Sequence, residues 1–121
     1  MGDDQSSNKY DLEERTFRFA KEVCQYTKKL KKTIPNIEYI RQVVKSSGSV
    51  GANYIEANEC LGKQDFKMRI RISRKESKES AFWLRLIVET NDPELKSEGT
   101  TLYNESVELK KIFPSILIKS A

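Results

Sequence analysis

Residues 63–90 read KQDFKMRIRISRKESKESAFWLRLIVET, and this segment decides the fold class. Apolar and small side chains recur in it at intervals of three and four residues, which is the spacing of one face of an α-helix. The residues on this face are Phe66, Ile70, Ser73, Ser77, Ala81, Leu84 and Val88. A sustained alternation of apolar and polar residues, which would indicate a strand, occurs nowhere in the chain. The segment therefore predicts a helix from near residues 63–65 to about Thr90, in an all-α protein.

A first helix is predicted to begin at Asp11, because Glu14 stands at the capping-box position three residues later. Its last turn is predicted to be cationic, which would complement the negative end of the helix dipole. The residues of this turn are Lys28, Lys29, Lys31 and Lys32. Pro35 is predicted to end the helix, because proline cannot continue the hydrogen-bond ladder. Residues 1–10 are polar, and we expect them to form a disordered N-terminal tail.

A second helix is predicted to follow Asn36 as its cap. Its apolar and small face consists of Ile37, Ile40, Val44, Ser47, Gly51, Tyr54, Asn58 and Leu61. Residues 46–51 read SSGSVG and by propensity indicate a loop, because glycine costs about 1 kcal/mol inside a helix. The apolar spacing nevertheless continues through them. We therefore favour one continuous helix, in which the small residues let a neighbouring backbone approach closely.

A fourth helix is predicted to begin at the junction of Asp92, as its N-cap, and Pro93, at its first position. Pro114 is expected to bend this helix or to end it early. The apolar and small face consists of Leu95, Leu102, Ser106, Leu109, Phe113 and Ile116. Four amphipathic helices with short connections predict an antiparallel up-down-up-down four-helix bundle over residues 11–118, as one domain in a chain of 121 residues.

The composition excludes several classes of function. The chain has no histidine, which excludes Ser-His-Asp and Cys-His catalytic groups and removes the commonest zinc and copper ligand. Cys24 and Cys60 are the only cysteines, and without a secretory context we expect them to be reduced and buried rather than bridged. No stretch approaches the roughly 18 apolar residues of a membrane span. We therefore expect a soluble cytoplasmic protein that does not associate with membranes.

A basic stripe is predicted along residues 63–78, where seven basic residues accompany two acidic ones. It consists of Lys63, Lys67, Arg71, Arg74, Lys75 and Lys78, which lie about a quarter-turn from the apolar face at ~100° per residue. Aromatic residues that could stack on bases are absent within it. The stripe therefore predicts contacts to the phosphates of RNA or DNA rather than base recognition. The alternative is a solvated helix face in a chain that is 33% charged.

A polar stripe is predicted on the second helix, opposite its apolar face. It consists of Gln42, Ser46, Ser49, Asn53, Glu56 and Cys60. Only Glu56 among them is charged, whereas an ordinary exposed face of this chain would carry lysine and glutamate. The stripe therefore predicts close contact with something, most simply an oligomer interface with another subunit. The alternative is a solvent-exposed face with unremarkable polar residues.

Catalytic chemistry has weak support in the sequence. An all-carboxylate metal site is the one enzymatic alternative, and its ligands would be Glu56, Glu59, Glu76 and Glu79. Helical-bundle metal sites use Glu-x-x-His pairs as well, and histidine is missing. Trp83, beside Phe82 and Leu84, indicates packing rather than a ligand platform. We therefore expect no catalytic residue, no cofactor, no metal and no small-molecule substrate.

Several motifs together resemble a known family. They are DLEERT at residues 11–16, SVGANYIEA at 49–57, Asp65-Phe66, Lys75-Glu76, and Glu79 with Phe82-Trp83-Leu84. In this order they are similar to the small four-helix-bundle proteins first noticed as open reading frames inside intervening sequences of bacterial 23S ribosomal RNA genes. The resemblance covers about residues 11–118, and the run at 49–57 and the Phe-Trp-Leu ending are its most specific parts.

The resemblance implies a ring-like homopentamer without enzymatic activity. It also implies a similarity to the accessory proteins of diversity-generating retroelements, which share the pentameric shape and bind nucleic acid through a basic surface. Asn53 and Glu56 match the family's motif on the second helix. The leading hypothesis is a self-associating bundle that binds RNA or DNA non-specifically, and the alternative is a structural or scaffolding oligomer that contacts only proteins.

Overall fold

The computed structural model describes residues 4–119, and it describes the side chains of residues 11–119. Four α-helices account for most of this part: α1 (Asp4–Thr27), α2 (Ile34–Glu59), α3 (Lys63–Thr90) and α4 (Lys96–Lys119). A short 3-10 turn, η1 (Pro93–Leu95), precedes α4. Residues 4–119 contain no strand, so the prediction of an all-α protein with four helices is confirmed.

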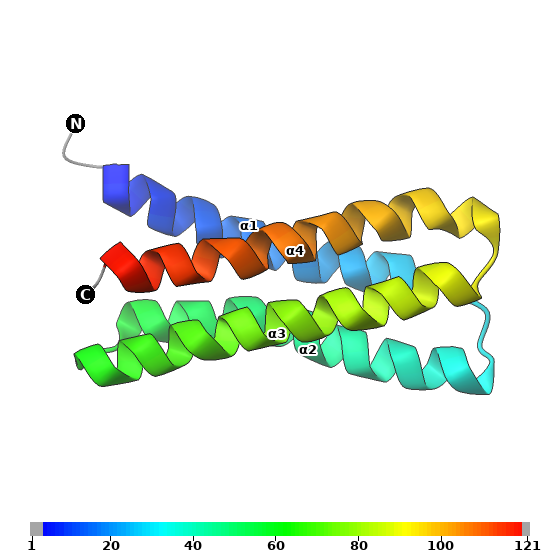
Figure 1. Ribbon diagram of the computed structural model, residues 1–121, viewed down its shortest axis with the longest axis horizontal. Coiled ribbons are helices and arrows are strands. Elements are labelled where there is room, and N and C mark those ends of the chain that lie inside the picture. The colour runs from blue at the N-terminus through cyan, green and yellow to red at the C-terminus, as the bar shows by residue number, and fades with distance from the viewer. Residues whose placement is uncertain (1–3, 120–121) are drawn as a thin grey trace.

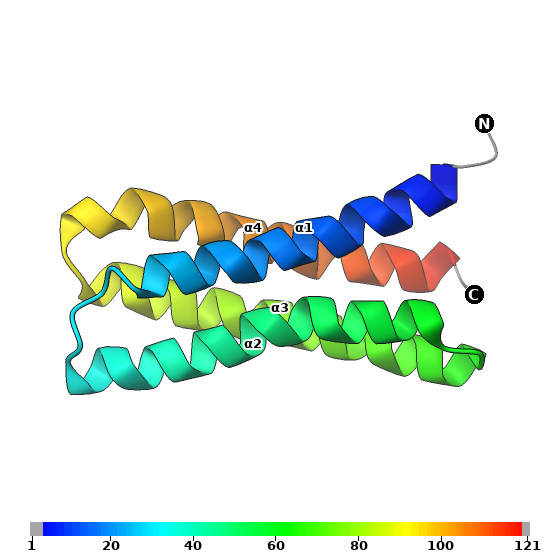
Figure 2. The ribbon, with the colours of Figure 1, turned by 180° about the vertical axis from the view of Figure 1, so that it is seen from behind.

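The four helices lie lengthwise, side by side, and the connections between them alternate between the two ends of the molecule (Figure 1). The view from behind shows the same arrangement, with α1 and α2 toward the viewer (Figure 2). α3 packs most extensively against α2 and α4, while α1 contacts α2 and α4 less. No helix within residues 4–119 combines the length and the apolar character needed to cross a membrane.

The first helix differs from its prediction at both ends. α1 begins at Asp4, so the predicted start at Asp11 was wrong, and only residues 1–3 of the expected tail lie outside the described residues. α1 ends at Thr27 and has no basic residue in its last turn, so the predicted cationic turn was also wrong. Lys32, beyond the helix, supplies the positive charge instead. Its Nζ donates to the carbonyl oxygens of Thr27 at 3.4 Å and Leu30 at 3.0 Å.

The N-cap of α2 lies three residues before its predicted position at Asn36, so that prediction was wrong. Thr33 is the N-cap, and its Oγ1 accepts the N–H of Asn36 at 3.3 Å. Pro35 lies in the first turn of this helix, where its missing N–H costs nothing. Asn36 is buried and joins the two connections at one end of the bundle, because its Nδ2 donates to the Lys31 carbonyl at 2.9 Å and to Asn91 Oδ1 at 2.8 Å.

The continuous helix through residues 46–51 is confirmed. A Cβ added at Gly51 would lie 2.9 Å from Thr16 Oγ1 and 3.2 Å from Thr16 Cβ, so the glycine is what lets α1 approach α2 at this level. An added Cβ at Gly48 would meet nothing within 4 Å. The expected close approach therefore depends on Gly51, and Gly48 faces open space.

The core contains apolar residues from all four helices, among them Phe19, Val43, Leu84 and Phe113. The predicted faces of α3 and α4 agree closely with it, but the predicted face of α2 was partly wrong. Ile37, Val44 and Leu61 are exposed, and Val43, Ser46, Val50 and Ala57 are buried instead. The two cysteines are free, as expected, but Cys24 is exposed and Cys60 is half-buried, so their predicted burial was wrong.

The connection between α3 and α4 follows its prediction closely. Asp92 caps η1 and Pro93 stands in its first turn. α4 then continues through Pro114 to Lys119, so Pro114 does not end the helix early. Proline removes a single N–H donor from the ladder, and packing of Phe113, which is fully buried, holds the helix on either side of it.

Candidate nucleic-acid interface

α3 has one flank that contacts α2, and its polar side chains are paired there. Ser73 Oγ donates to the Val50 carbonyl oxygen at 2.9 Å, and Ser80 Oγ lies 2.8 Å from Ser46 Oγ. Nearer the start of α3, Arg69 Nη1 donates to Asn53 Oδ1 at 2.9 Å. We call this side of α3 its α2-side flank. Polar atoms here are satisfied by partners within the chain.

The opposite flank of α3 contacts α4. A Cβ added at Gly99 of α4 would collide with Tyr26 and with Val88 of α3. Arg85 lies nearly one turn before Val88 on α3. The Glu89 carboxylate, and to a smaller extent Tyr103 of α4, raise the pKa of the Arg85 guanidinium. These neighbours define the α4-side flank. Residues that precede Val88 on α3 therefore lie beside residues that follow Gly99 on α4.

The predicted basic stripe lies along the α4-side flank. At ~100° per residue, Lys63, Lys67, Arg74 and Lys78 fall on the same side as Val88 and Arg85, with Arg71 slightly further outward. Lys75 points further still, toward the outer face. Lys67 is half-buried and the other five are exposed. None of the six takes part in an ion pair or side-chain hydrogen bond within residues 11–119.

α4 adds a cation that the sequence analysis did not connect with the stripe. The register set by Val88 with Gly99 and Arg85 with Tyr103 brings Lys78 to the level of Lys110, and Arg74 lies about one turn further along the two helices. Lys110 is half-buried and lies on the α3 side of α4 by its spacing from Tyr103. The basic surface therefore spans two helices, and a helix-by-helix reading of the sequence cannot show this because it needs the register.

Three of the four acidic residues of α3 lie away from this surface. By the same spacing Asp65, Glu76 and Glu79 lie toward α2 or the outer face, away from Arg74 and Lys78. Burial, and after it the neighbouring Glu79 carboxylate, raises the pKa of the Glu76 carboxyl, while Lys75 and Lys45 oppose the shift. Over residues 63–79 the two signs of charge thus occupy different flanks, which leaves this part of the α4-side flank with an excess of positive charge. Glu89, near the end of α3, lies on the α4-side flank and is paired with Arg85.

The predicted polar stripe of α2 is divided between the interior and the surface. Ser46 is 3% exposed and bonded to Ser80, so its assignment to an oligomer interface was wrong, because the partner is α3 of the same chain. Asn53 is half-buried and accepts from Arg69. Gln42, Ser49 and Glu56 retain exposed surface, and their contact with another subunit stays a prediction.

Apolar side chains are exposed where α1 meets α2. Phe17 of α1 is 60% exposed, and Val44 and Ile55 of α2 are 41% and 44% exposed. Phe17 follows Thr16, which contacts Gly51, and by helical spacing Val44 and Ile55 lie on the α1 side of α2. The apolar stripe expected inside the bundle is therefore partly on this outer surface, which we call the α1–α2 surface.

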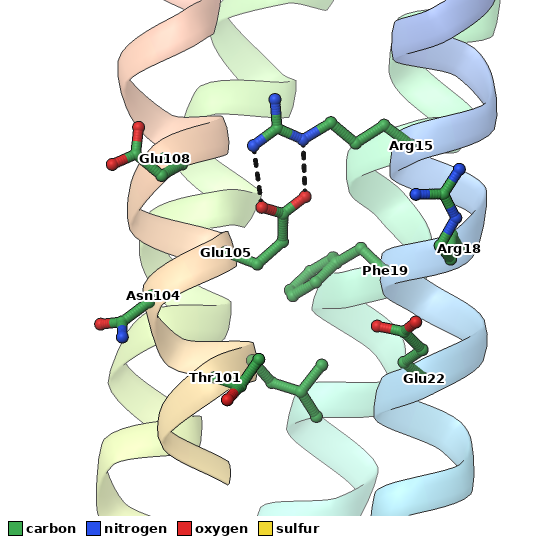
Figure 3. A pocket seen from close by; sticks show the side chains of 9 residues that line it. Arg15, Arg18, Phe19, Glu22, Thr101, Asn104, Glu105 and Glu108 are labelled. Atoms are coloured by element: carbon green, nitrogen blue, oxygen red, sulfur yellow. Dashed lines mark hydrogen bonds and ion pairs between the residues drawn. The ribbon is translucent and has the colours of Figure 1, made fainter. Parts of the chain in front are cut away.

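A hollow of about 390 Å³ lies between α1 and α4 (Figure 3). Across it Arg15 of α1 forms two hydrogen bonds with Glu105 of α4, at 2.7 and 2.8 Å, and the buried ring of Phe19 lies beside the pair. Arg18 and Glu22 line the α1 wall, so the charges of the hollow are mixed. Within residues 11–119 no group of three or more Cys, Asp or Glu side chains has the arrangement of a metal site.

Comparisons with known proteins agree on the fold. A family model described as 23S rRNA-intervening sequence protein matches residues 8–115. A crystal structure from Bacteroides thetaiotaomicron VPI-5482, described as a protein with unknown function from the S23 ribosomal protein family, is 25% identical to this chain. The match covers 87% of this chain and 96% of the other, with a TM-score of 0.75. A search of curated proteins found no match.

Proposed function

Because this chain belongs to the 23S rRNA-intervening sequence protein family, we propose that it is a self-associating, non-enzymatic bundle that binds RNA or DNA through phosphates. The observation that carries the proposal is the separation of charge on α3. Over residues 63–78, cations without an ion pair or side-chain hydrogen bond in the described chain gather on the α4-side flank, and the acidic residues lie elsewhere. Each phosphate that such a cation neutralises releases counterions, so affinity arises without base recognition.

Self-association would repeat one weakly binding surface on every subunit. In this proposal the up-down-up-down antiparallel bundle forms a ring, expected to be a homopentamer, in which every subunit presents the same basic flank. A ring uses two different surfaces on each subunit. The apolar α1–α2 surface and the polar residues Gln42, Ser49 and Glu56 beside α3 are two such surfaces. Linked copies raise the effective concentration of binding sites along one nucleic acid.

Charge reversal tests the binding surface. We expect Arg71→Glu to weaken binding of a fluorescent RNA duplex, and of a DNA duplex of equal length, by about tenfold at low salt, since one contact is replaced by repulsion. Arg18→Glu is the matched control, because it changes the net charge equally on α1, away from α3. Equal losses in both variants, or no binding by the wild type, would contradict the proposal and leave a scaffold that contacts only proteins.

Sedimentation mass tests self-association. Wild-type protein should have the mass of an oligomer, and Ile55→Lys or Asn53→Lys should lower it by placing a charge at a subunit contact. The two variants also separate the two surfaces, because Ile55 belongs to the apolar one and Asn53 borders the polar one. A monomeric wild type, or an oligomer that neither substitution affects, would refute this part of the proposal.

A further inference from the structure

Three aromatic side chains form a row from α2 to the outer face of α3. The rings of Tyr39 and Trp83 have centroids 6.1 Å apart at an interplanar angle of 34°. Trp83 and Phe82 follow at 5.1 Å in an edge-to-face arrangement of 82°. Tyr39 and Trp83 are half-buried, whereas Phe82 is 58% exposed. Tyr39 and Trp83 thus support the exposed ring of Phe82 from behind, which limits the side-chain entropy that Phe82 loses when a ligand stacks on it.

Phe82 stands at the edge of the basic surface. Lys78 precedes it by one turn and Arg85 follows it by nearly one turn, both on the side of the ring that faces the basic surface. Glu79, three residues before Phe82, lies on the other side of the ring. Arg85 is held by Glu89 at 2.9 Å, while Lys78 has no partner within residues 11–119. Phe66, the one aromatic residue within residues 63–78, lies on the apolar face and packs against the core, and Phe82 is the first aromatic residue beyond that segment.

We infer that this surface takes a single strand of nucleic acid, with one unpaired base stacked on Phe82 and the adjoining phosphates on Lys78 and Arg74. The inference rests on the proposed function and specifies its substrate. An unpaired base offers a free π-face, and stacking of this kind tolerates any base. Bases inside a duplex are already stacked on both faces, so Phe82 adds affinity for a single strand alone.

A second protein is a poorer fit to the same place. The cores of protein interfaces are depleted of charged residues, and lysine is among the most depleted. Seating an apolar partner on Phe82 would remove water from Lys78, which has no carboxylate within the described chain to compensate it. Phosphates beside a base supply the opposite charge at the required positions.

The test uses the single tryptophan as the reporter, since Trp83 lies against Phe82. A 12-nucleotide oligo(U), a 12-nucleotide oligo(dT) and a 12-base-pair duplex are titrated into the full chain while Trp83 fluorescence is recorded. We expect both single strands to change the fluorescence with saturation. Phe82→Leu should weaken single-strand binding by about tenfold, and Phe82→Tyr should retain it, because only the aromatic face is required. Neither substitution should change duplex affinity.

The outcomes separate this inference from the proposed function. If the wild type binds none of the three ligands, both fail. If Phe82→Leu binds single strands as the wild type does, or loses duplex and single strand equally, stacking on Phe82 is refuted while phosphate binding stands. A fall in sedimentation mass of Phe82→Leu would identify Phe82 as a subunit contact and would also refute the inference. Equal behaviour of oligo(U) and oligo(dT) supports recognition of base and phosphate without the 2′-hydroxyl, and a preference for oligo(U) adds that group.

Discussion

Along α3, Ser73 and Ser80 on the α2-side flank are fully buried and hydrogen-bonded, whereas Arg71 and Arg74 on or beside the α4-side flank are exposed and have no partner in the described chain. One helix therefore carries polar side chains that are hydrogen-bonded within the chain on one flank and polar side chains that are exposed to solvent on the other. The residue type does not distinguish them, because Arg69 on the α2-side flank is paired with Asn53. The presence of a partner within the chain separates residues that hold the fold from residues available to a ligand.

The two flanks also differ in what they contribute to stability. A buried serine hydrogen bond adds about 1 kcal/mol, and leaving its partner unsatisfied costs more. Exposed cations without partners add close to nothing to the fold. Substitutions on the α2-side flank should therefore change the free energy of unfolding and spare binding, while substitutions on the α4-side flank should do the opposite.

The largest effect is expected from reversing two cations together. The double variant Arg71→Glu, Arg74→Glu should lose about a hundredfold in duplex affinity, if each reversal costs about tenfold. Its free energy of unfolding should stay within about 0.5 kcal/mol of the wild type, because both side chains are exposed. Fluorescence binding and urea unfolding measure the two quantities. A comparable loss of stability would show that these cations hold the fold.

A substitution on the opposite flank should give the reverse result. Ser73→Leu places a larger side chain against Val50, where α2 and α3 are tightly packed, and should cost about 1–3 kcal/mol of stability. Ser73→Ala is the control that removes the hydrogen bond without adding volume, and about 1 kcal/mol is expected. Duplex affinity per folded molecule should be unchanged in both, and a loss of affinity would mean that the two flanks are not independent.

Adding a cation away from α3 sharpens the comparison further. Glu14→Lys raises the net charge by the amount that Arg71→Glu lowers it, but at an exposed position of α1. We expect duplex affinity to change less than about twofold, because exposed charges further apart than ~10 Å are screened at ordinary salt. An increase of tenfold would show that net charge, rather than its placement on the α4-side flank, governs binding.

The smallest effect concerns the pH dependence of stability through Glu76. Burial and the Glu79 carboxylate raise the pKa of Glu76 in the folded state above its ordinary value of 4.5, so the ionised form is disfavoured by folding. The native state binds the proton more tightly, and this residue's contribution to stability therefore falls as the pH rises from 4.5 through the folded-state pKa. Glu76→Gln should remove that fall. Urea unfolding across pH 4–7 measures the difference, and parallel curves would contradict it.

Much of the fold follows from periodicity in the sequence. The bounds of α3 were predicted within two residues, and the helix through residues 46–51 was predicted correctly because the apolar spacing outweighed the glycine penalty. The cap of α2 was missed because Thr33 and Asn36 are both good capping residues, and only the backbone geometry selects Thr33.

The parts that failed depend on which helix each face contacts. Ser46 is buried because Ser80 of α3 lies against it. The apolar spacing of α2 predicts that Val44 is buried instead, because valine is apolar and serine is not, but Val44 is exposed. The candidate site was predicted in its α3 residues only. Lys110 joins it through the register of α3 with α4, which the spacing within one helix cannot show. Phe82 lies one turn from Lys78 on the same helix, but the support of its ring by Trp83 and Tyr39 depends on packing between α2 and α3.

The most direct test of the central claim is the slope of the logarithm of the binding constant against the logarithm of the salt concentration, for a DNA duplex. If five cations on each engaged subunit neutralise phosphates, the wild-type slope should be about −4 to −5 per engaged subunit, and Arg71→Glu should flatten it by about one. Arg18→Glu should keep the wild-type slope. A wild-type slope near zero, or the same slope in Arg71→Glu, would contradict phosphate binding by the basic surface of α3.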